Sequence, residues 1–173
     1  MIEINSLLAT GNELLTVSSG KKVLVPKCSV SFILWRGAKL TNTYGNKAVI
    51  DFEGQPAFAE TAVLGAVKKA GWDGVWVDTF GKKFRVGLPD VVAPIALPEI
   101  QARVLDEISL KAGGFKGCWD VFLWKNNHYR FIELKRKARD AIRATQLAWL
   151  EAALAVGFIP EHFLLVDWDI AGD

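Results

Sequence analysis

The chain has 173 residues, with 21 lysine and arginine residues against 19 aspartate and glutamate residues, for a net charge of +2. A hydrophobic content of 51% excludes a disordered chain, and the length suits one domain with a modest extension. No apolar run approaches the length of a membrane span, and no signal peptide pattern is present. We therefore expect a soluble, intracellular (cytoplasmic) protein without a membrane partner.

The residue types that carry chemistry are few. The two cysteines, Cys28 and Cys118, form no C-x-x-C pattern, and the two histidines are His128 and His162. A structural zinc site or a Cys/His nucleophile pair is therefore disfavoured. Glycine-rich phosphate loops and a G-x-S-x-G motif are also absent from the sequence. These exclusions leave carboxylate and lysine chemistry.

Residues 1–50 are predicted to form a β-rich N-terminal extension. Two strands are expected, at 22–26 and 29–35, with a break at Pro26, and the cluster 42–46 is typical of a turn. The sequence leaves open whether this extension contacts a dimer partner or DNA, or covers a hydrophobic edge.

Residues 51–173 alternate between helix and strand patterns. A first helix is expected from Gly54 to Ala70, because Pro56 suits its first turn. Glu60 lies three and four residues before Val63 and Leu64, which places it on the apolar side of this helix.

Strands at 72–80 and 84–86 follow, and then a helix from Pro98 to Ala112, which we interpret as an insertion between core strands. The apolar stripe predicted for this helix consists of Ile100, Val104, Ile108 and Ala112. Asp90 follows a proline, but the early break at Pro94 argues against a core strand there.

Two apolar runs around a polar break, 117–124 and 129–135, predict a β-hairpin. The first run contains Asp120. The second contains Glu133 and Lys135, which must point to the same face because strand side chains alternate. Two carboxylates beside a lysine suit a divalent cation and a phosphate.

The last helix is predicted over 138–156 and ends at Gly157, and a buried strand is expected over 163–168. Gln146 lies four residues after Ile142 and three before Trp149, so it falls on the apolar stripe. An amide in that place needs a polar partner, and the hairpin carboxylates and lysine could provide one. Since leucine would restore apolar burial, we expect Gln146→Leu to cost no stability.

Asp120, Glu133-Leu134-Lys135 and Gln146 resemble the D…(E)xK…Q constellation of the PD-(D/E)xK nuclease superfamily. Gly117, three residues before the aspartate, and the close downstream glutamine resemble the VRR-NUC (virus-type replication-repair nuclease) branch, over about residues 55–168. The residue before the aspartate is Trp119, where the motif has proline. The resemblance implies a restriction-endonuclease-like αβββαβ core: an α/β fold with a mixed sheet flanked by helices.

The resemblance also implies a site for Mg²⁺ or Mn²⁺. Its ligands would be carboxylates and one backbone carbonyl, from Asp120, Glu133, Leu134 and Glu60. Lys135 would polarise the attacking water or bind the phosphate, and Gln146 would hold Lys135 or a water in place. Glu53 is the alternative to Glu60.

The implied function is cleavage of DNA, with branched DNA such as Holliday junctions as the expected substrate and a homodimer as the expected assembly. Basic side chains near the hairpin and the last helix are candidates for phosphate contacts: Lys125, Arg136, Lys137, Arg139 and Arg143. The alternatives are a restriction or repair nuclease acting on duplex or single strands, and a nuclease-fold module that binds without cutting.

Overall fold

The computed structural model describes residues 7–172, which form an α/β fold with one open, mixed sheet of nine strands and three α-helices. The strands are β1 (Gly11–Thr16), β2 (Lys22–Leu34), β3 (Ile50–Phe52), β4 (Gln55–Ala57), β5 (Asp73–Asp78), β6 (Lys83–Arg85), β7 (Val121–Lys125), β8 (His128–Arg136) and β9 (Phe163–Ile170). The helices are α1 (Ala59–Lys69), α2 (Glu99–Ala112) and α3 (Ala144–Ala155), with a short 3₁₀ turn, η2 (Pro160–His162). In this part of the chain, no helix has the length and apolar character that crossing a membrane requires.

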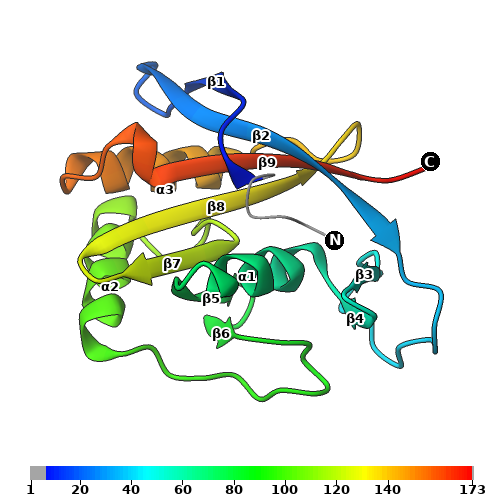
Figure 1. The fold of residues 1–173 in the computed structure, drawn as a ribbon. Coiled ribbons are helices and arrows are strands. Elements are labelled where there is room, and N and C mark those ends of the chain that lie inside the picture. Colours follow the sequence, from blue (N-terminus) through cyan, green and yellow to red (C-terminus); the bar gives the residue numbers. More distant parts are fainter. Residues whose placement is uncertain (1–6, 173) are drawn as a thin grey trace.

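The strand order is β4-β3-β2-β9-β8-β7-β5-β6, and β1 pairs with β2 beside this path (Figure 1). The centre of the sheet is parallel, because β9 runs parallel to both β2 and β8. The strands β5, β7 and β8 are antiparallel neighbours. This arrangement confirms the predicted α/β class, with a mixed sheet flanked by helices.

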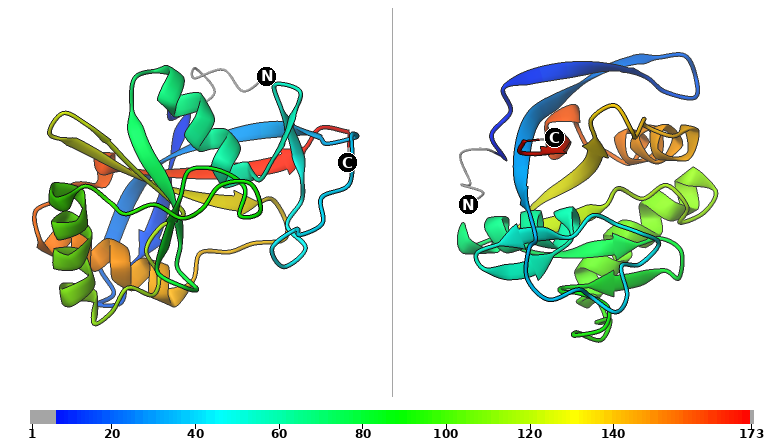
Figure 2. Two further views of the ribbon diagram at one scale, coloured as in Figure 1. Left: turned by 90° about the horizontal axis from the view of Figure 1, so that it is seen from below. Right: turned by 90° about the vertical axis from the view of Figure 1, so that its right-hand side faces the viewer.

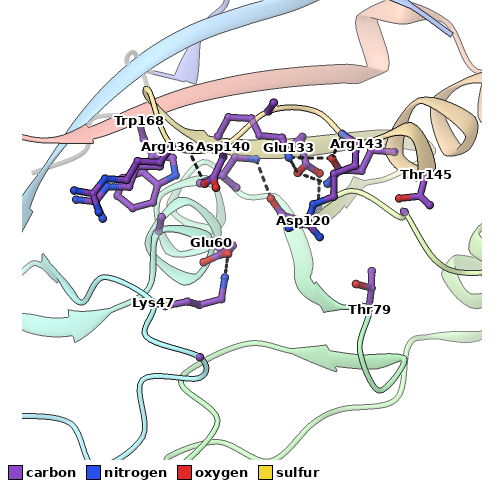
Figure 3. Close-up of a pocket in the computed structure, with 18 of the residues that line it drawn as sticks. Lys47, Glu60, Thr79, Asp120, Glu133, Arg136, Asp140, Arg143, Thr145 and Trp168 are labelled. Atoms are coloured by element: carbon purple, nitrogen blue, oxygen red, sulfur yellow. Dashed lines mark hydrogen bonds and ion pairs between the residues drawn. The ribbon is translucent and has the colours of Figure 1, made fainter.

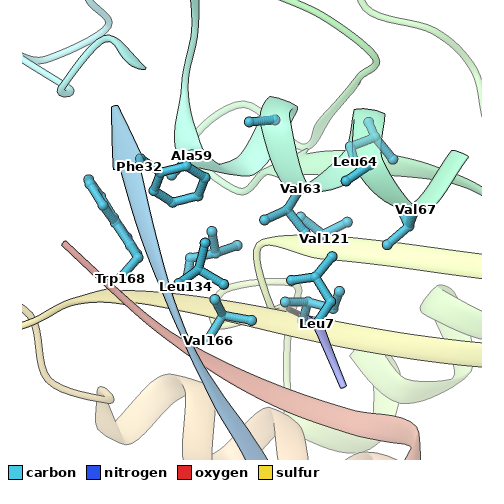
Figure 4. Close-up of a cluster of buried hydrophobic side chains, with 14 of the residues drawn as sticks. Leu7, Phe32, Ala59, Val63, Leu64, Val67, Val121, Leu134, Val166 and Trp168 are labelled. Atoms are coloured by element: carbon cyan, nitrogen blue, oxygen red, sulfur yellow. The ribbon is translucent and has the colours of Figure 1, made fainter. Parts of the chain in front are cut away.

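The helices cover both faces of the sheet (Figure 2). On one face α1 packs Val63, Leu64 and Val67 over strand residues that include Val121 and Leu134 (Figure 4). On the other face α2 and α3 cover a second cluster, which includes Trp119, Phe131 and Trp149. Successive residues of β8 alternate between these clusters, so Glu133 and Lys135 share the α3 face and Leu134 faces α1, as strand geometry predicts.

The hairpin of β7 and β8 is present as predicted, and it turns at Asn126 and Asn127 between Lys125 and His128. Asn126 has a φ of 55°, a left-handed conformation that asparagine tolerates better than most residues. From α1 onward, the order α1, β5, β7, β8, α3, β9, with β6 and α2 inserted after β5, agrees with the predicted sequence of elements.

Two predictions about prolines are wrong. The first helix begins at Ala59, since Pro56 lies in β4, an edge strand where its missing N–H leaves no ladder bond unmade. Pro26 does not break its strand either. It lies inside β2 just before Lys27, where the pairing with β9 begins, so the central ladder does not need its N–H.

The two later helices also differ in detail. In α2 the buried side chains are Gln101, Leu105 and Ile108, while Ile100 is exposed, so the inward stripe is rotated by one residue from the prediction. Helix α3 starts at Ala144 rather than Ala138, since Ala138 has a left-handed φ of 57° and the chain that follows it forms part of the wall of a cleft described below. Gly157 follows its end with a φ of 104°, as predicted.

The N-terminal segment is continuous with the rest of the sheet. The strand β2 pairs with β9 from Lys27 to Phe32, and β3 continues the sheet beyond β2. The β-rich character predicted for residues 1–50 holds for the described part, whereas the domain boundary at residue 50 stays a prediction, and residues 1–6 lie outside the described residues.

Gly117 positions the segment that leads into β7. Its φ is +100°, and an added Cβ would lie 2.2 Å from the Thr145 carbonyl oxygen at the start of α3.

We expect Gly117→Ala to lower the free energy of unfolding by about 1 to 3 kcal/mol more than Gly113→Ala, because a forced contact adds to the conformational strain. Gly113 is the matched control, since its φ is +75° but nothing lies within 4 Å of an added Cβ. Chemical denaturation of both variants measures the difference, and equal losses would contradict the packing argument.

Candidate active site

An open cleft of about 1060 Å³ lies where β7 begins, β8 ends and α3 starts (Figure 3). Its floor contains the predicted acids and the lysine, and its walls come from the loop before β3, the start of α1 and residues 136–146. All five residues predicted to be catalytic line this cleft: Glu60, Asp120, Glu133, Lys135 and Gln146.

Sheet register brings Asp120 and Glu133 together. Val121 of β7 is paired with Ile132 of β8, so Asp120 comes just before β7 and lies beside Glu133. The Asp120 N–H donates to Glu133 Oε2 at 3.3 Å. Its side-chain Oδ2 accepts from the Leu134 N–H at 3.0 Å, which fixes the carboxylate at the open end of the hairpin.

Gln146 connects the acid and the lysine. Its Nε2 donates to Glu133 Oε1 at 2.6 Å, and its Oε1 accepts from Lys135 Nζ at 2.9 Å. The same Oε1 accepts from the Arg143 N–H at 2.9 Å, where it caps the first turn of α3. Lys135 Nζ also lies 2.8 Å from Glu133 Oε1. The amide thus occupies the position on the apolar stripe for which the sequence predicted polar partners.

Burial of the two carboxylates changes their proton affinity. Desolvation raises the pKa of Asp120 to about 6, and the nearby charge of Glu60 adds to the effect. Desolvation and the charge of Asp120 hold the pKa of Glu133 well above its usual range. Lys135 opposes both shifts without cancelling them. Burial therefore disfavours the charged form of both carboxyl groups, although basic side chains line the same cleft.

The Leu134 backbone faces the same open edge. Its N–H bonds to Asp120, and in an extended strand the N–H and C=O of one residue point to the same side. Because β7 begins opposite Ile132, no β7 residue pairs with Leu134. The predicted carbonyl ligand thus lies on the side of β8 that faces Asp120.

Glu60 enters the cleft from the first turn of α1 and is 7% exposed. Lys47 Nζ donates to its Oε1 and forms an ion pair with it. Glu53, the alternative acid, lies in the β3–β4 turn, pairs with Lys69 and does not line the cleft. Within residues 7–172, no group of three or more His, Cys, Asp or Glu side chains is arranged to hold a metal ion.

The predicted phosphate-binding residues divide into two groups. Arg136, Arg139 and Arg143 line the cleft. Lys125 does not, because it lies at the opposite end of the hairpin and donates to the Ala70 carbonyl at 2.9 Å. Lys137 is also outside the cleft, where it pairs with Asp169 at 3.0 Å.

Several cleft residues were not predicted from the sequence: Lys47, Lys116 and Asp140. Asp140 accepts from the Arg136 N–H at 3.2 Å and so shapes the turn that leads to α3. Lys47 comes from the loop before β3, far from the motif along the chain. Its only signal was a turn-rich composition, which does not reveal the contact with Glu60.

No protein-family model matches this chain, and no curated protein matches it either.

One prediction for this site concerns the stability of the Asp120→Asn variant in metal-free buffer. The raised pKa of Asp120 means that the folded state binds this proton more tightly than the unfolded state, so stability should fall as pH rises from about 4 to about 6 and stay low above. Asp120→Asn removes this cost and can still accept from Leu134. We expect thermal melts in EDTA to show the variant more stable at pH 7.5, by up to about 3 kcal/mol, and equal to wild type at pH 4.

Asp90→Asn is the control for removing one negative charge, since Asp90 lies on an exposed turn outside the cleft. A stability gain of the same size in both variants would mean that overall charge, rather than the Asp120 environment, is responsible.

Another prediction for this site concerns the stability of the Gln146→Leu variant. Because the amide satisfies Glu133, Lys135 and the Arg143 N–H, the sequence-based expectation for Gln146→Leu must be reversed. We now expect this variant to lose about 1 to 3 kcal/mol, since Glu133 is 1% exposed and would lose a donor. Urea denaturation measures the loss. Leu147→Ala, at a partly buried position of the same helix, calibrates the effect of a modest packing change, and an unchanged midpoint for Gln146→Leu would contradict the structural role of the amide.

Proposed function

We propose that this protein is a divalent-metal-dependent DNA endonuclease of the PD-(D/E)xK type, most similar to the VRR-NUC branch. The observation that carries the proposal is the connected set Asp120, Glu133, Lys135 and Gln146 at the floor of an open cleft. Asp120, Glu133 and Gln146 belong to three different segments of the chain, and they meet there. The succession of α1, β5, β7, β8, α3 and β9 supports the proposal, because it has the order of an αβββαβ core.

The residues of the cleft fit a hard divalent cation. Such cations prefer oxygen ligands and keep several waters, so a pair of carboxylates and a carbonyl can suffice. Asp120 and Glu133 would hold Mg²⁺ or Mn²⁺ together with the Leu134 carbonyl, and Glu60 would join them only after it exchanges Lys47 for the ion. The raised pKa values support this assignment, since burial disfavours the charged form of both carboxyl groups and a bound cation would stabilise that form. When bound, the ion would act as a Lewis acid toward the phosphate and its attacking water.

The side chains have separate tasks in this proposal. Lys135 would donate to the phosphate or orient the attacking water from its place beside Glu133. Gln146 would keep the Lys135 ammonium in that place through its 2.9 Å hydrogen bond. Arg136, Arg139 and Arg143 would follow the phosphate backbone along one wall of the cleft.

The preference for branched DNA and a homodimeric assembly rest on the resemblance alone. Two matched cuts in a symmetric junction need two sites, which a dimer would supply. Light scattering of the protein alone and with junction DNA tests the dimer.

The other candidate functions are a nuclease for duplex or single strands and a module that binds nucleic acid without cutting it. The intact acid–acid–lysine set favours cleavage over binding alone.

Incubation with labelled junction, flap, duplex and single-stranded DNA under Mg²⁺, Mn²⁺ or EDTA tests the function directly. We expect cleavage with either metal and none in EDTA, and we expect the junction to be cut fastest. Absence of cleavage on every substrate, with retained DNA binding, would favour the binding module.

Lys135→Ala should lower the cleavage rate by about 10² to 10³-fold, because the lysine is the cation closest to the carboxylate pair. Lys137→Ala is the matched control, since it lies two residues on but pairs with Asp169 outside the cleft. Both variants should give cooperative thermal melts. A Lys135→Ala protein that cleaves at the wild-type rate would show that this lysine has another role.

A further inference from the structure

One cation of the cleft has no counterpart in the motif and comes from the N-terminal segment. Lys47 follows the turn before β3, and Figure 3 shows it on the wall that carries Glu60, with Asp120 and Glu133 between it and Arg143. The other cationic side chains of the cleft belong to its floor or to other walls: Lys116, Lys135, Arg136, Arg139 and Arg143. Lys47 thus supplies positive charge on a side of the acidic floor that Arg143 does not reach.

The contact with Glu60 does not use all the donors of Lys47. An ammonium group has three N–H donors, so Lys47 can donate to Glu60 and to a second acceptor at once. Its side chain is 35% exposed while that of Glu60 is 9% exposed, so the accessible member of the pair is the cation. A strand of nucleic acid in the cleft would therefore meet Lys47 rather than Glu60.

The turn that carries Lys47 is held by a buried group of polar side chains. The Tyr44 hydroxyl donates to Asp78, and Arg85 Nε donates to the same Asp78 oxygen at 3.2 Å. Asp78 and Arg85 are each 5% exposed, and removing one member of such a pair is costly. The Tyr44 ring also packs edge-on against Trp76, with 5.7 Å between the ring centroids. This anchor lies on β5 and β6, which belong to the body of the fold.

The turn itself is ordered by local hydrogen bonds. Asn42 Oδ1 accepts from the Tyr44 N–H at 2.8 Å, and the Lys47 N–H donates to the Thr43 carbonyl at 2.9 Å. Tyr44 and Asn46 have φ values of 52° and 64°. Tyr44 is thus fixed to β5 and β6 three residues before Lys47, and this fixes where the lysine enters the cleft.

We propose that Lys47 binds a backbone phosphate of the substrate strand other than the phosphate that would be cleaved beside Asp120 and Glu133, and that Tyr44 is the residue that positions Lys47. Lys135 already lies beside Glu133, whereas Glu60 separates Lys47 from that pair. The inference deepens the proposed nuclease function and rests on it.

The test measures DNA binding rather than cleavage. All variants carry Asp120→Asn, so that a labelled four-way junction and a labelled duplex are bound without being cut. Fluorescence anisotropy with Mg²⁺ gives Kd over a series of salt concentrations. The pair Glu60→Gln and Lys47→Met/Glu60→Gln isolates the lysine without leaving a buried carboxylate unpaired.

Removing Lys47 in this pair should weaken binding by about tenfold and reduce the slope of log K against log salt by about 0.7 to 0.9, the value of one lost phosphate contact. The matched control is the pair Asp106→Asn and Lys82→Met/Asp106→Asn, which removes the lysine of an exposed ion pair outside the cleft in the same way and should change neither quantity. Lys47→Arg keeps the positive charge, so it should leave the salt slope of the Asp120→Asn protein unchanged.

Tyr44→Phe tests the positioning role. It should weaken binding when Lys47 is present and have no further effect in the Lys47→Met/Glu60→Gln variant, because the two residues would act as one unit. A purely structural tyrosine would give the same loss in both backgrounds, which would overturn its assignment.

The results separate the inference from the function on which it rests. If wild type cleaves DNA with Mg²⁺ but removal of Lys47 leaves both Kd and the salt slope unchanged, the inference is wrong and the proposed function stands. If wild type neither cleaves nor binds any of the substrates, both are wrong. Thermal melts of every variant confirm that the measured proteins are folded.

Discussion

The buried carboxylate of Glu133 imposes the strictest condition on this structure. The side chain is 1% exposed, and a charge in such a place is tolerated only with close polar partners. Lys135 and Gln146 supply them at 2.8 and 2.6 Å. Because Gln146 belongs to α3, this helix must begin over the end of β8. Trp119 contributes to the same arrangement, because its indole N–H donates to the backbone carbonyl of Gln146 at 3.3 Å.

Burial still disfavours the charged form of both acids. Desolvation raises the pKa of Asp120 and of Glu133, with further contributions from the charge of Glu60 at Asp120 and of Asp120 at Glu133, even though Lys135 lies beside them. Replacing a buried pair of charges by apolar residues is often neutral or stabilising in proteins, which is in keeping with the proposal that these acids hold a metal ion. The basic side chains around the acids are in keeping with the proposed substrate, whose phosphates would need a cation between their own charge and that of the acids.

The N-terminal segment contributes to both the sheet and the cleft. The strand β2 pairs with the central strand β9 along six residues, and the turn that follows it is tied to Asp78 and Arg85 through Tyr44. The segment that the sequence predicted to be a β-rich extension thus forms part of the sheet and one wall of the cleft. Loss of this segment would leave β9 without its β2 neighbour and the cleft without Lys47.

The sequence by itself determined the elements from α1 onward, apart from the exact ends of the helices, and the pairing of the hairpin of β7 and β8, whereas β1, β3 and β4 were not predicted. Alternation placed Glu133 and Lys135 on one face, and helical spacing placed Gln146 on the packed side of α3, because both periods are properties of the backbone. Only the tertiary structure decided which contacts join distant segments. The ion pair of Lys47 with Glu60, the anchoring of Tyr44 and the separation of Lys125 and Lys137 from the cleft depend on sheet order and loop paths. The prolines at 26 and 56 lie in strands for the same reason, since the cost of a missing N–H depends on whether a neighbouring strand needs it.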